Sequence, residues 1–550
     1  MAEFDSLVDS LMQRKNAPEA SYIQDKDAKT LKLEQIPGRG QGVFAGQSLS
    51  VTDSICSLNY PTMMAIDSDL VQTTCYHCLV VTATHLPLPS YGHASIDLKT
   101  CNGCHFARFC GRDCQLKSWH AYHKHECKIF KKLKNNQLPA ILRAVLRVVL
   151  LQDRDKLPSE EWARITSLVS HEEILAGRGR SNLTDMAEGI KHLAESSMSV
   201  ETIQRLIFIM KSNATELPTP VQGGIGVMLE PLVAKFNHSC EPNLSIHRPQ
   251  HTMTSGWMDS KQLSEDDRKT FARVVPLRDI KEGEELLNIY VAPTSGVKAR
   301  KAKLMEDYFF ECTCPKCVSD VDAATHLANQ EPGLPDQFEK WTQEVTRHIA
   351  QIGQKPDAFQ KAATAMDKSA RFLEYPALYT SGEFPDIART LVLEGLKGQA
   401  FDEALINALR LYFLVNPHRF VGRHNPTNIY TIFLTLDIFD AILEISTPPE
   451  VAKDKSAKWL SNLSTRGLSR NGLIYWRQRI CADLKKRIEA GAVKDLDALV
   501  EKREEQMRKS TVQTADIEGE EFKRVAEGEM RDALRLKEPR WQVVLQENGS

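Results

Sequence analysis

The chain has 550 residues, too many for one ordinary core, and at about 150 residues per domain it predicts roughly three or four domains. Its hydrophobic fraction of 42% and charged fraction of 26% are ordinary for a folded protein. The formal net charge of -2 excludes a globally basic or acidic chain, so overall charge predicts no class of partner.

The sequence has no feature typical of a secreted or membrane-spanning protein. Its first residues lack a basic start followed by an apolar stretch, so no secretory signal is visible. The most apolar run, residues 138–151, is short and contains Arg143 and Arg147, which is typical of a buried helix and not of a membrane span. We therefore expect an intracellular protein with no membrane association. Its 13 cysteines would then be reduced, and their grouping in CxxC-type pairs favours zinc over disulfides.

The first predicted strand pair encloses a glycine-rich turn. Residues 30–36 alternate apolar and polar side chains, as in a half-buried strand, and a second strand begins at Val43. Between them, Gly38, Gly40 and Gly42 predict a tight turn whose backbone could approach a ligand closely. A plain hairpin turn explains the same residues, and the turn lacks the Lys-Ser/Thr of a phosphate-binding loop.

Residues 75–127 contain four pairs of soft metal ligands. Each pair can be presented from a single turn, and four ligands complete a closed tetrahedral zinc site, so eight ligands predict two zinc ions. Interleaved pairing, first pair with third and second with fourth, would cross-brace a segment too short to bury its own core. Scattered structural cysteines would not show this paired spacing. The predicted ligands are Cys75 and Cys78, Cys101 and Cys104, Cys110 and Cys114, and His123 and Cys127.

Three histidines compete for the last ligand position. If residues 114–127 are helical, His123 lies four residues before Cys127 on the same face. His120 is seven residues from Cys127, roughly 10 Å along the axis at about 1.5 Å per residue, and His125 points away. We therefore predict His123 as the ligand.

Helices are predicted after the cysteine pairs, and strands return further along the chain. Over residues 138–217, apolar residues recur at three- and four-residue spacing, which indicates core packing. His171 falls near the end of one of these helices, where a capping or structural role is an alternative to ligand binding. Strand patterns reappear at 223–229 and 270–275, and a later turn feeds a strand that leads to Tyr290.

A third zinc site is predicted from residues far apart in the chain. Cys312, Cys314 and Cys317 supply three thiolates, one short of a closed site. Cys240, in the polar run 236–243, is the candidate for the fourth ligand, although such a run taken alone is equally typical of a surface turn. Eleven of the 13 cysteines are then zinc ligands, and the other two, Cys56 and Cys481, are expected to be ordinary buried thiols.

From about residue 323 the pattern is helical without strand signals. Residues 391–413 and 430–443 are predicted to be amphipathic helices of a stacked antiparallel array. The C-terminal residues are dense in Lys, Arg and Glu, which predicts an exposed helix followed by a poorly ordered tail.

The order of these features resembles the SET and MYND domain family of protein lysine methyltransferases. Residues 114–127, Cys-Gln-Leu-Lys-Ser-Trp-His-Ala-Tyr-His-Lys-His-Glu-Cys, are similar to the end of a MYND finger. The glycine turn, Asn-His-Ser-Cys, Gly-Glu-Glu-Leu leading to Tyr290, and Cys-x-Cys-x-x-Cys are arranged around the finger as in that family. The gap between Cys78 and Cys101 is longer than in the family, and we expect an insertion that loops out without disturbing the metals.

The resemblance implies a multidomain α+β protein. A β-rich SET fold would be split by a MYND zinc finger and a helical insert, and an all-α, TPR-like C-terminal domain would follow. The implied divisions are an N-terminal segment (1–24), the first part of the SET domain (25–72), the MYND finger (73–130), the helical insert (131–217), the SET core (218–311), the post-SET zinc segment (312–322), the helical C-terminal domain (323–500) and a charged helical or disordered tail (501–550).

The resemblance also implies which residues bind S-adenosyl-L-methionine and the substrate lysine. Tyr290 would be the catalytic tyrosine, and Tyr308 would line the lysine channel. Three zinc ions would be bound, the third by the family's post-SET set of Cys240, Cys312, Cys314 and Cys317. The implied cofactor contacts are Arg39, Gln41, His171, Asn237, His238 and Phe310, the last by stacking on the adenine.

The implied function is S-adenosyl-L-methionine-dependent N-methylation of a protein lysine, histone or non-histone, by a monomer in the cytoplasm and nucleus. A channel walled by Tyr290, Tyr308 and Phe310 suits this chemistry because it excludes water, lowers the pKa of the lysine and favours a cationic methyl group. The alternative function is a non-catalytic adaptor that binds peptides through its finger and its C-terminal helices. Basic residues after Cys101 suit nucleic-acid contact or a solvated basic face.

Overall fold

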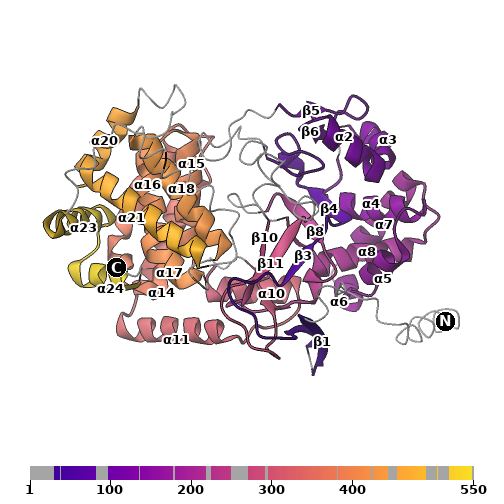
Figure 1. The fold of residues 1–550 in the computed structure, drawn as a ribbon, viewed down its shortest axis with the longest axis horizontal. Coiled ribbons are helices and arrows are strands. Elements are labelled where there is room, and N and C mark those ends of the chain that lie inside the picture. Colours follow the sequence, from indigo (N-terminus) through magenta and orange to yellow (C-terminus); the bar gives the residue numbers. More distant parts are fainter. Residues whose placement is uncertain are drawn as a thin grey trace.

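The described residues of the computed structural model form two large apolar cores and one small one. Figure 1 shows the N-terminal half, with short strands and helices, beside a lobe built of C-terminal helices. The predicted N-terminal segment 1–24, the insertion within 82–96 and most of the charged run 501–509 lie outside the described residues. Described are residues 30–37, 39–81, 97–134, 137–177, 180–217, 224–248, 270–291, 295–380, 382–420, 422, 425–443, 455–490, 505 and 519–547.

The predicted glycine-rich turn joins two antiparallel strands, β1 (Leu31–Ile36) and β2 (Gly40–Ala45). The other edge of β2 contacts the segment that leads to Tyr290. Val43 O accepts from Leu286 N at 2.7 Å, and Ala45 N donates to Glu284 O at 2.9 Å. The turn and the Gly-Glu-Glu-Leu motif are therefore neighbours, although more than 200 residues separate them.

The remaining strands are short, with two to five residues each. One parallel pair, β9 (Asn237–His238) with β12 (Leu287–Asn288), aligns Asn237 with Leu287 and His238 with Asn288, two residues before Tyr290. Two sheets have three antiparallel strands, and one further pair is antiparallel. Their members are β10 (Leu244–His247), β11 (Ala272–Pro276) and β3 (Cys56–Leu58); β4 (Met63–Ile66), β8 (Gly226–Leu229) and β7 (Thr215–Glu216); and β5 (Lys99–Thr100) with β6 (Arg108–Phe109).

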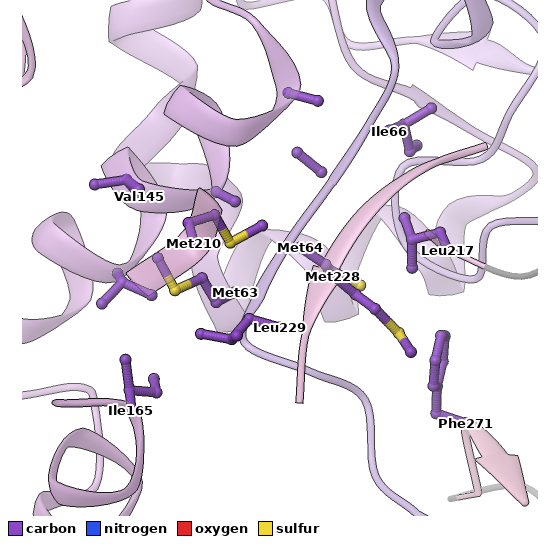
Figure 2. Close-up of a cluster of buried hydrophobic side chains, with 14 of the residues drawn as sticks. Met63, Met64, Ile66, Val145, Ile165, Met210, Leu217, Met228, Leu229 and Phe271 are labelled. Carbon is purple, nitrogen blue, oxygen red and sulfur yellow. The ribbon is translucent and has the colours of Figure 1, made fainter. Parts of the chain in front are cut away.

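The N-terminal core lies between the β4–β8 strands and the helices predicted from the apolar spacing. Met63, Met210 and Met228 are fully buried there, as Figure 2 shows, and their flexible thioethers fill the irregular space between helix and sheet. Helix α8 begins where the Ser199 side chain accepts from the backbone N–H of Thr202. The helices are α4 (Ala140–Gln152), α5 (Ser159–Thr166), α6 (Glu172–Gly177), α7 (Arg180–Ala194) and α8 (Val200–Asn213).

The described residues of the C-terminal lobe form helices joined by turns, with no strand among them, as predicted from residue 323 onward. Its helices enclose the second large core. They are α11 (Pro315–Gln330), α12 (Leu334–Ile349), α13 (Ala358–Asp367), α14 (Pro376–Tyr379), α15 (Phe384–Lys397), α16 (Phe401–Arg410), α17 (Asn416–Arg419), α18 (Pro426–Leu443), α20 (Ser456–Thr465), α21 (Arg470–Glu489), α23 (Glu520–Leu534) and α24 (Glu538–Glu547).

Three predictions for this lobe were wrong in detail. Residues 391–413 are not one amphipathic helix, because α15 ends at Lys397 and α16 begins at Phe401. Helix α18 is buried on nearly every described side and is not amphipathic. The tail is not simply exposed: α23 and α24 bury Met530, Trp541 and Val544 against the core. Apolar side chains of this charged segment therefore pack into the core, although its composition predicted an exposed segment.

Among the described residues, no helix combines the length and the apolarity that crossing a bilayer requires.

The β4–β8 pair gives a direct test of this packing. A Cβ at Gly226 would lie 2.1 Å from the carbonyl oxygen of Ala65 on the paired strand, so the two backbones would have to separate. We expect Gly226→Ala to lower the free energy of unfolding by about 2 kcal/mol, measured by chemical denaturation. Gly189→Ala is the matched control, because no atom outside its own helix lies within 4 Å of the added carbon. Equal stability of the two variants would contradict the strand pairing.

Candidate active site and zinc clusters

The eight ligands predicted in residues 75–127 form two separate clusters with the predicted interleaved pairing. Within each cluster all ligand atoms lie within 4.8 Å of one another. Neighbouring sulfurs are 3.5, 3.6 and 3.8 Å apart. Sulfurs about 2.3 Å from a tetrahedral zinc ion would be roughly 3.8 Å apart, so both clusters have the dimensions of zinc sites. One cluster is Cys75, Cys78, Cys110 and Cys114, and the other is Cys101, Cys104, His123 and Cys127.

His123 occupies the ligand position that was predicted for it. Its Nε2 lies 3.4 Å from Cys101 Sγ and 3.7 Å from Cys104 Sγ. The helix that carries it is continuous through α2 (Arg112–Ser118), a π-helical turn (Trp119–His123) and α3 (Lys124–Leu133). The other ring nitrogen, Nδ1, lies 3.7 Å from a carboxylate oxygen of Glu126. At this distance the carboxylate acts on the histidine ring through its charge and not through a hydrogen bond.

Glu126 also connects this helix to α4. Arg147 donates from Nε to Glu126 at 2.6 Å and from Nη2 to the Tyr76 hydroxyl at 3.0 Å, and Tyr76 donates to the same carboxylate at 3.1 Å. Burial disfavours the charge, but Arg147 and His123 outweigh it and lower the pKa of Glu126 to about 2. The buried carboxylate is therefore charged, and it locks the cysteine-rich segment onto the N-terminal core.

The third predicted cluster also forms. Cys240 Sγ lies 3.5 Å from Cys317 Sγ and 4.0 Å from Cys312 Sγ, and Cys314 completes a set whose ligand atoms are all within 4.8 Å of one another. Tyr290, Tyr308 and Phe310 are partly buried against this cluster, which is the centre of the small third core. The cluster therefore holds the aromatic segment before Cys312 against the residues that follow β9.

A buried arginine that the sequence analysis did not single out supports the third cluster. Arg300, on α10 (Val297–Asp307), donates from Nε to Cys240 Sγ at 3.3 Å and from Nη2 to Cys317 Sγ at 3.8 Å. The same guanidinium pairs with Asp320 on α11 at 2.7 Å. Four thiolates around one zinc ion leave a net negative charge, so a fixed cation at this distance stabilises the metal-bound state.

This arrangement predicts that Arg300→Met weakens zinc binding at the third cluster by about tenfold to a hundredfold. Zinc affinity can be measured by competition with a chromophoric chelator. Lys303→Met is the control, since that side chain lies on the same helix, is 59% exposed and pairs only with Asp307 among the described ion pairs. An unchanged affinity in Arg300→Met would show that the guanidinium does not support the metal.

One cavity of about 1160 Å³ lies beside the third cluster, and all eight residues predicted to serve the cofactor or the lysine channel line it. They come from the β1–β2 turn, the residues between α5 and α6, the segment around β9, the residues after β12 and the segment after α10. The eight are Arg39, Gln41, His171, Asn237, His238, Tyr290, Tyr308 and Phe310. The cavity is large enough to hold a drug-sized molecule.

Glu285 organises the end of the cavity formed by the glycine turn. Arg39 Nη2 donates to its two carboxylate oxygens at 3.2 and 3.3 Å, and Asn237 Nδ2 donates to Oε1 at 2.8 Å. Asn237 also donates to the backbone oxygen of Gln41 at 3.2 Å. A Cβ at Gly42 would lie 2.9 Å from Glu285 Oε1 and 3.0 Å from Asn237 Nδ2, so this close approach requires glycine.

His238 joins the cavity to the third cluster. Its Nδ1 accepts from the backbone N–H of Tyr290 at 3.0 Å, which leaves the proton on Nε2, 3.3 Å from Cys240 Sγ. Burial lowers the pKa of His238 to about 4, so the imidazole is neutral at physiological pH. Both ring nitrogens are engaged, and the ring acts as a fixed wall.

Three aromatic rings continue this wall. The ring centroid of Tyr290 is 4.7 Å from that of Tyr308 and 5.2 Å from that of His238, and the Phe310 ring is 5.9 Å from the His238 ring. The Tyr290 hydroxyl donates to the backbone oxygen of Phe236 at 2.7 Å. Burial and then the neighbouring Tyr308 and Glu285 raise the pKa of Tyr290, and burial and then Asp307 and Glu216 raise the pKa of Tyr308 to about 12. Both hydroxyls are therefore neutral and protonated.

His171 contacts an aromatic residue that sequence reasoning did not assign. The His171 and Phe309 rings pack edge to face with their centroids 5.1 Å apart, and both residues line the cavity. Both also have positive φ, 47° for His171 and 63° for Phe309. Such conformations cost about 1–3 kcal/mol each in non-glycine residues and persist only where the surroundings hold them. The contact therefore closes one side of the cavity between the helical insert and the segment before Cys312.

Sequence reasoning missed four residues of this region: Lys235, Glu285, Arg300 and Phe309. Glu285 and Phe309 stand inside motifs that were used for other residues, and Lys235 directly precedes the run 236–243. Their place in or beside a motif could have marked these three residues, but the sequence did not show which distant residues they contact. Arg300 gave none, because its role depends on contacts between α10 and a distant cysteine.

The position of Cys240 predicts an effect on ligand binding although Cys240 is not among the residues that line the cavity. We expect Cys240→Ser to lower bound zinc by one ion per chain. It should also weaken binding of S-adenosyl-L-methionine, the cofactor that the sequence resemblance implies, by about tenfold, because Tyr308 and Phe310 lose their anchor. Elemental analysis and calorimetry measure the two effects. Cys481→Ser, outside the three clusters, should leave both unchanged. Loss of zinc without any loss of cofactor affinity would contradict the proposed coupling.

Comparison with known proteins agrees with this geometry. Residues 75–127 match the MYND finger family. The "SET domain and MYND-type zinc finger protein 6" of Schizosaccharomyces pombe is 25% identical over 302 residues, which cover 54% of this chain and 53% of that protein. The human "Histone-lysine N-methyltransferase SMYD3" is 27% identical over 265 residues, 46% of this chain and 56% of that protein.

A third similar protein is the "N-lysine methyltransferase SMYD2-A" of Danio rerio, 27% identical over 256 residues, 45% of this chain and 54% of that protein. The chain thus spans about half the length of each of these curated relatives.

Proposed function

Because the chain is related to the SET and MYND domain proteins, as its sequence predicted, we propose that it is an S-adenosyl-L-methionine-dependent protein-lysine N-methyltransferase. The proposal includes a SET fold that the MYND finger and the helical insert divide, with a TPR-like domain after it. One observation carries the proposal. The eight residues assigned to cofactor and lysine from sequence alone line a single cavity.

The residues of the cavity suit this cofactor. Phe310 offers an aromatic face for an adenine ring, and the end near Arg39, Gln41 and Asn237 offers amide and cationic groups for an amino-acid tail. When bound, S-adenosyl-L-methionine supplies a sulfonium methyl group that an amine can take up in a single displacement. The protein's contribution to such a reaction is mainly alignment, which lowers a barrier by about 7–11 kcal/mol in favourable cases.

The two tyrosines would prepare the substrate lysine. Their packed rings exclude water, and burial beside a cation lowers the pKa of a lysine, so the amine arrives neutral and nucleophilic. The Tyr290 proton is engaged on the Phe236 carbonyl, which leaves the lone pairs of the hydroxyl oxygen to face a partially positive methyl group. His238 is not a general base, because its Nδ1 already accepts from Tyr290 N–H. The lysine proton would leave through water.

Cofactor binding tests the proposal first. Calorimetry with the zinc-loaded full chain should give saturable binding of S-adenosyl-L-methionine, and a labelled-methyl assay on a protein array should then transfer label to lysine. No measurable cofactor binding by folded, zinc-loaded protein would overturn the proposal and favour an adaptor that binds peptides.

The Tyr290 hydroxyl can be tested separately. We expect Tyr290→Phe to lower turnover by about a hundredfold, because the oxygen that faces the transferring methyl group is lost. Cofactor affinity and thermal stability should change little, since the ring remains. Tyr375→Phe, which removes a hydroxyl that donates to Glu331 far from the cavity, is the control. Full activity in Tyr290→Phe would mean that this hydroxyl takes no part in the reaction.

A further inference from the structure

Asn237 lines the cavity, and two neighbouring residues determine the direction of its amide group. Its Nδ2 donates to Glu285 Oε1 at 2.8 Å and to the backbone oxygen of Gln41 at 3.2 Å. An ionised carboxylate and a backbone carbonyl only accept hydrogen bonds, so the amide has to turn its NH2 group toward them. Both N–H bonds of the amide are then used, and the oxygen is the polar atom that remains.

The remaining amide oxygen is an acceptor for which the protein supplies no donor. Among the residues that the structure describes, none donates to Asn237 Oδ1. The backbone of Asn237 is fixed as well, because β9 pairs in parallel with β12 and aligns Asn237 with Leu287. A ligand in the cavity would therefore meet a fixed acceptor at this position.

Glu285 is held firmly enough to impose this direction. Its backbone oxygen accepts from Asn243 Nδ2 at 2.8 Å, and its side chain is only 16% exposed. Arg39 Nη2 donates to the two carboxylate oxygens at 3.2 and 3.3 Å, so a positive charge balances the nearly buried negative one. A carboxylate paired with a guanidinium is ionised at neutral pH and offers Asn237 no donor.

The proposed cofactor carries a donor that suits this acceptor. The amino-acid tail of S-adenosyl-L-methionine ends in a carboxylate and an ammonium, and only the ammonium donates hydrogen bonds. The proposed function places that tail at the end of the cavity near Arg39 and Asn237. An amide turned the other way would point its N–H groups at the same ammonium and would repel it.

We propose, resting on the proposed function, that Glu285 is a positioning residue that fixes the Asn237 amide so that its oxygen accepts from the ammonium of the cofactor. Glu285 is not among the named lining residues and acts through Asn237. The competing explanation is that Glu285 only ties the glycine turn to the strands. The two explanations differ in whether its effect depends on the polarity of the pair and on the ligand having an amino-acid tail.

An exchange of donor and acceptor tests the polarity. In Asn237→Asp an oxygen replaces the NH2 group, so two charged oxygens face each other in buffer above neutral pH. We expect this variant of the zinc-loaded full chain to bind S-adenosyl-L-methionine about a hundredfold more weakly in calorimetry. Adding Glu285→Gln supplies an NH2 group to the new carboxylate. The double variant should recover about tenfold of the loss, because the pair is complementary again although the contact with the Gln41 backbone stays lost.

The matched control restores the same net charge without the contact. Glu311 also lines the cavity, but its side chain is 64% exposed and pairs with Lys301. Asn237→Asp combined with Glu311→Gln has the net charge of the exchanged pair and should bind no better than Asn237→Asp alone. Zinc content and circular dichroism establish that each variant is folded.

A second ligand separates positioning from bracing. Methylthioadenosine keeps the nucleoside of the cofactor and lacks the amino-acid tail. We expect Glu285→Ala to weaken S-adenosyl-L-methionine binding by about tenfold, the effect of one hydrogen bond to a charged group, and to leave methylthioadenosine binding unchanged. Glu285→Ala also keeps the test independent of whether Asn237→Asp folds.

Each other outcome overturns the inference. Equal weakening of both ligands in Glu285→Ala would assign Glu285 to bracing the turn, and unchanged affinity for both would leave it without a role in binding. A double variant with Glu285→Gln that binds no better than Asn237→Asp alone would remove the polarity of the pair, and equal recovery with Glu311→Gln would assign the effect to net charge. Absence of cofactor binding to the wild-type protein is a different result, because it removes the proposed function itself.

Discussion

The four-cysteine cluster of Cys240, Cys312, Cys314 and Cys317 is the constraint on which the candidate site depends. It joins segments 72 positions apart, and the aromatic residues Tyr308 and Phe310 lie four and two residues before its second member, Cys312. Without this connection, only packing would keep the aromatic rings of the segment after α10 against the cavity. That packing would have to offset the full conformational entropy lost when the segment is ordered. Arg300 strengthens the connection by balancing the thiolate charge and by pairing with Asp320 on α11, so the cluster also ties the site to the C-terminal helices.

The cavity beside the cluster combines two kinds of surface. At one end, Glu285 gathers Arg39 and Asn237, and Lys235 lies against Gln41, which gives a polar region with fixed hydrogen-bond directions. At the other end, neutral aromatic rings dominate, because burial keeps the His238 ring and the tyrosine hydroxyls uncharged. A molecule with a charged tail, a flat ring and a reactive cationic centre between them fits this division.

The sequence predicted most of the metal-ligating and cavity-lining residues but few of the residues that hold them in place. Paired cysteine spacing identified the two clusters within residues 75–127, and helix geometry selected His123 over His120. The third cluster was predicted because three close cysteines lacked a fourth ligand, which Cys240 supplies. Motif resemblance selected eight residues that line one cavity in the structure. It could not identify Glu285, Arg300 or Lys235, since their roles exist only between segments that the chain brings together on folding. The sequence predicted that the C-terminal lobe is helical. The break between α15 and α16 and the packing of α23 and α24 were not predicted, because they depend on tertiary contacts that override local periodicity.

Hydrogen–deuterium exchange of the zinc-loaded protein, with and without S-adenosyl-L-methionine, tests the account most directly. One ligand bound in the cavity should slow exchange together in residues 39–41, 237–240 and 308–314, three segments that only the folded site connects. Protection confined to one of these segments, protection elsewhere, or no change at saturating cofactor would contradict a single cofactor site built around the third cluster.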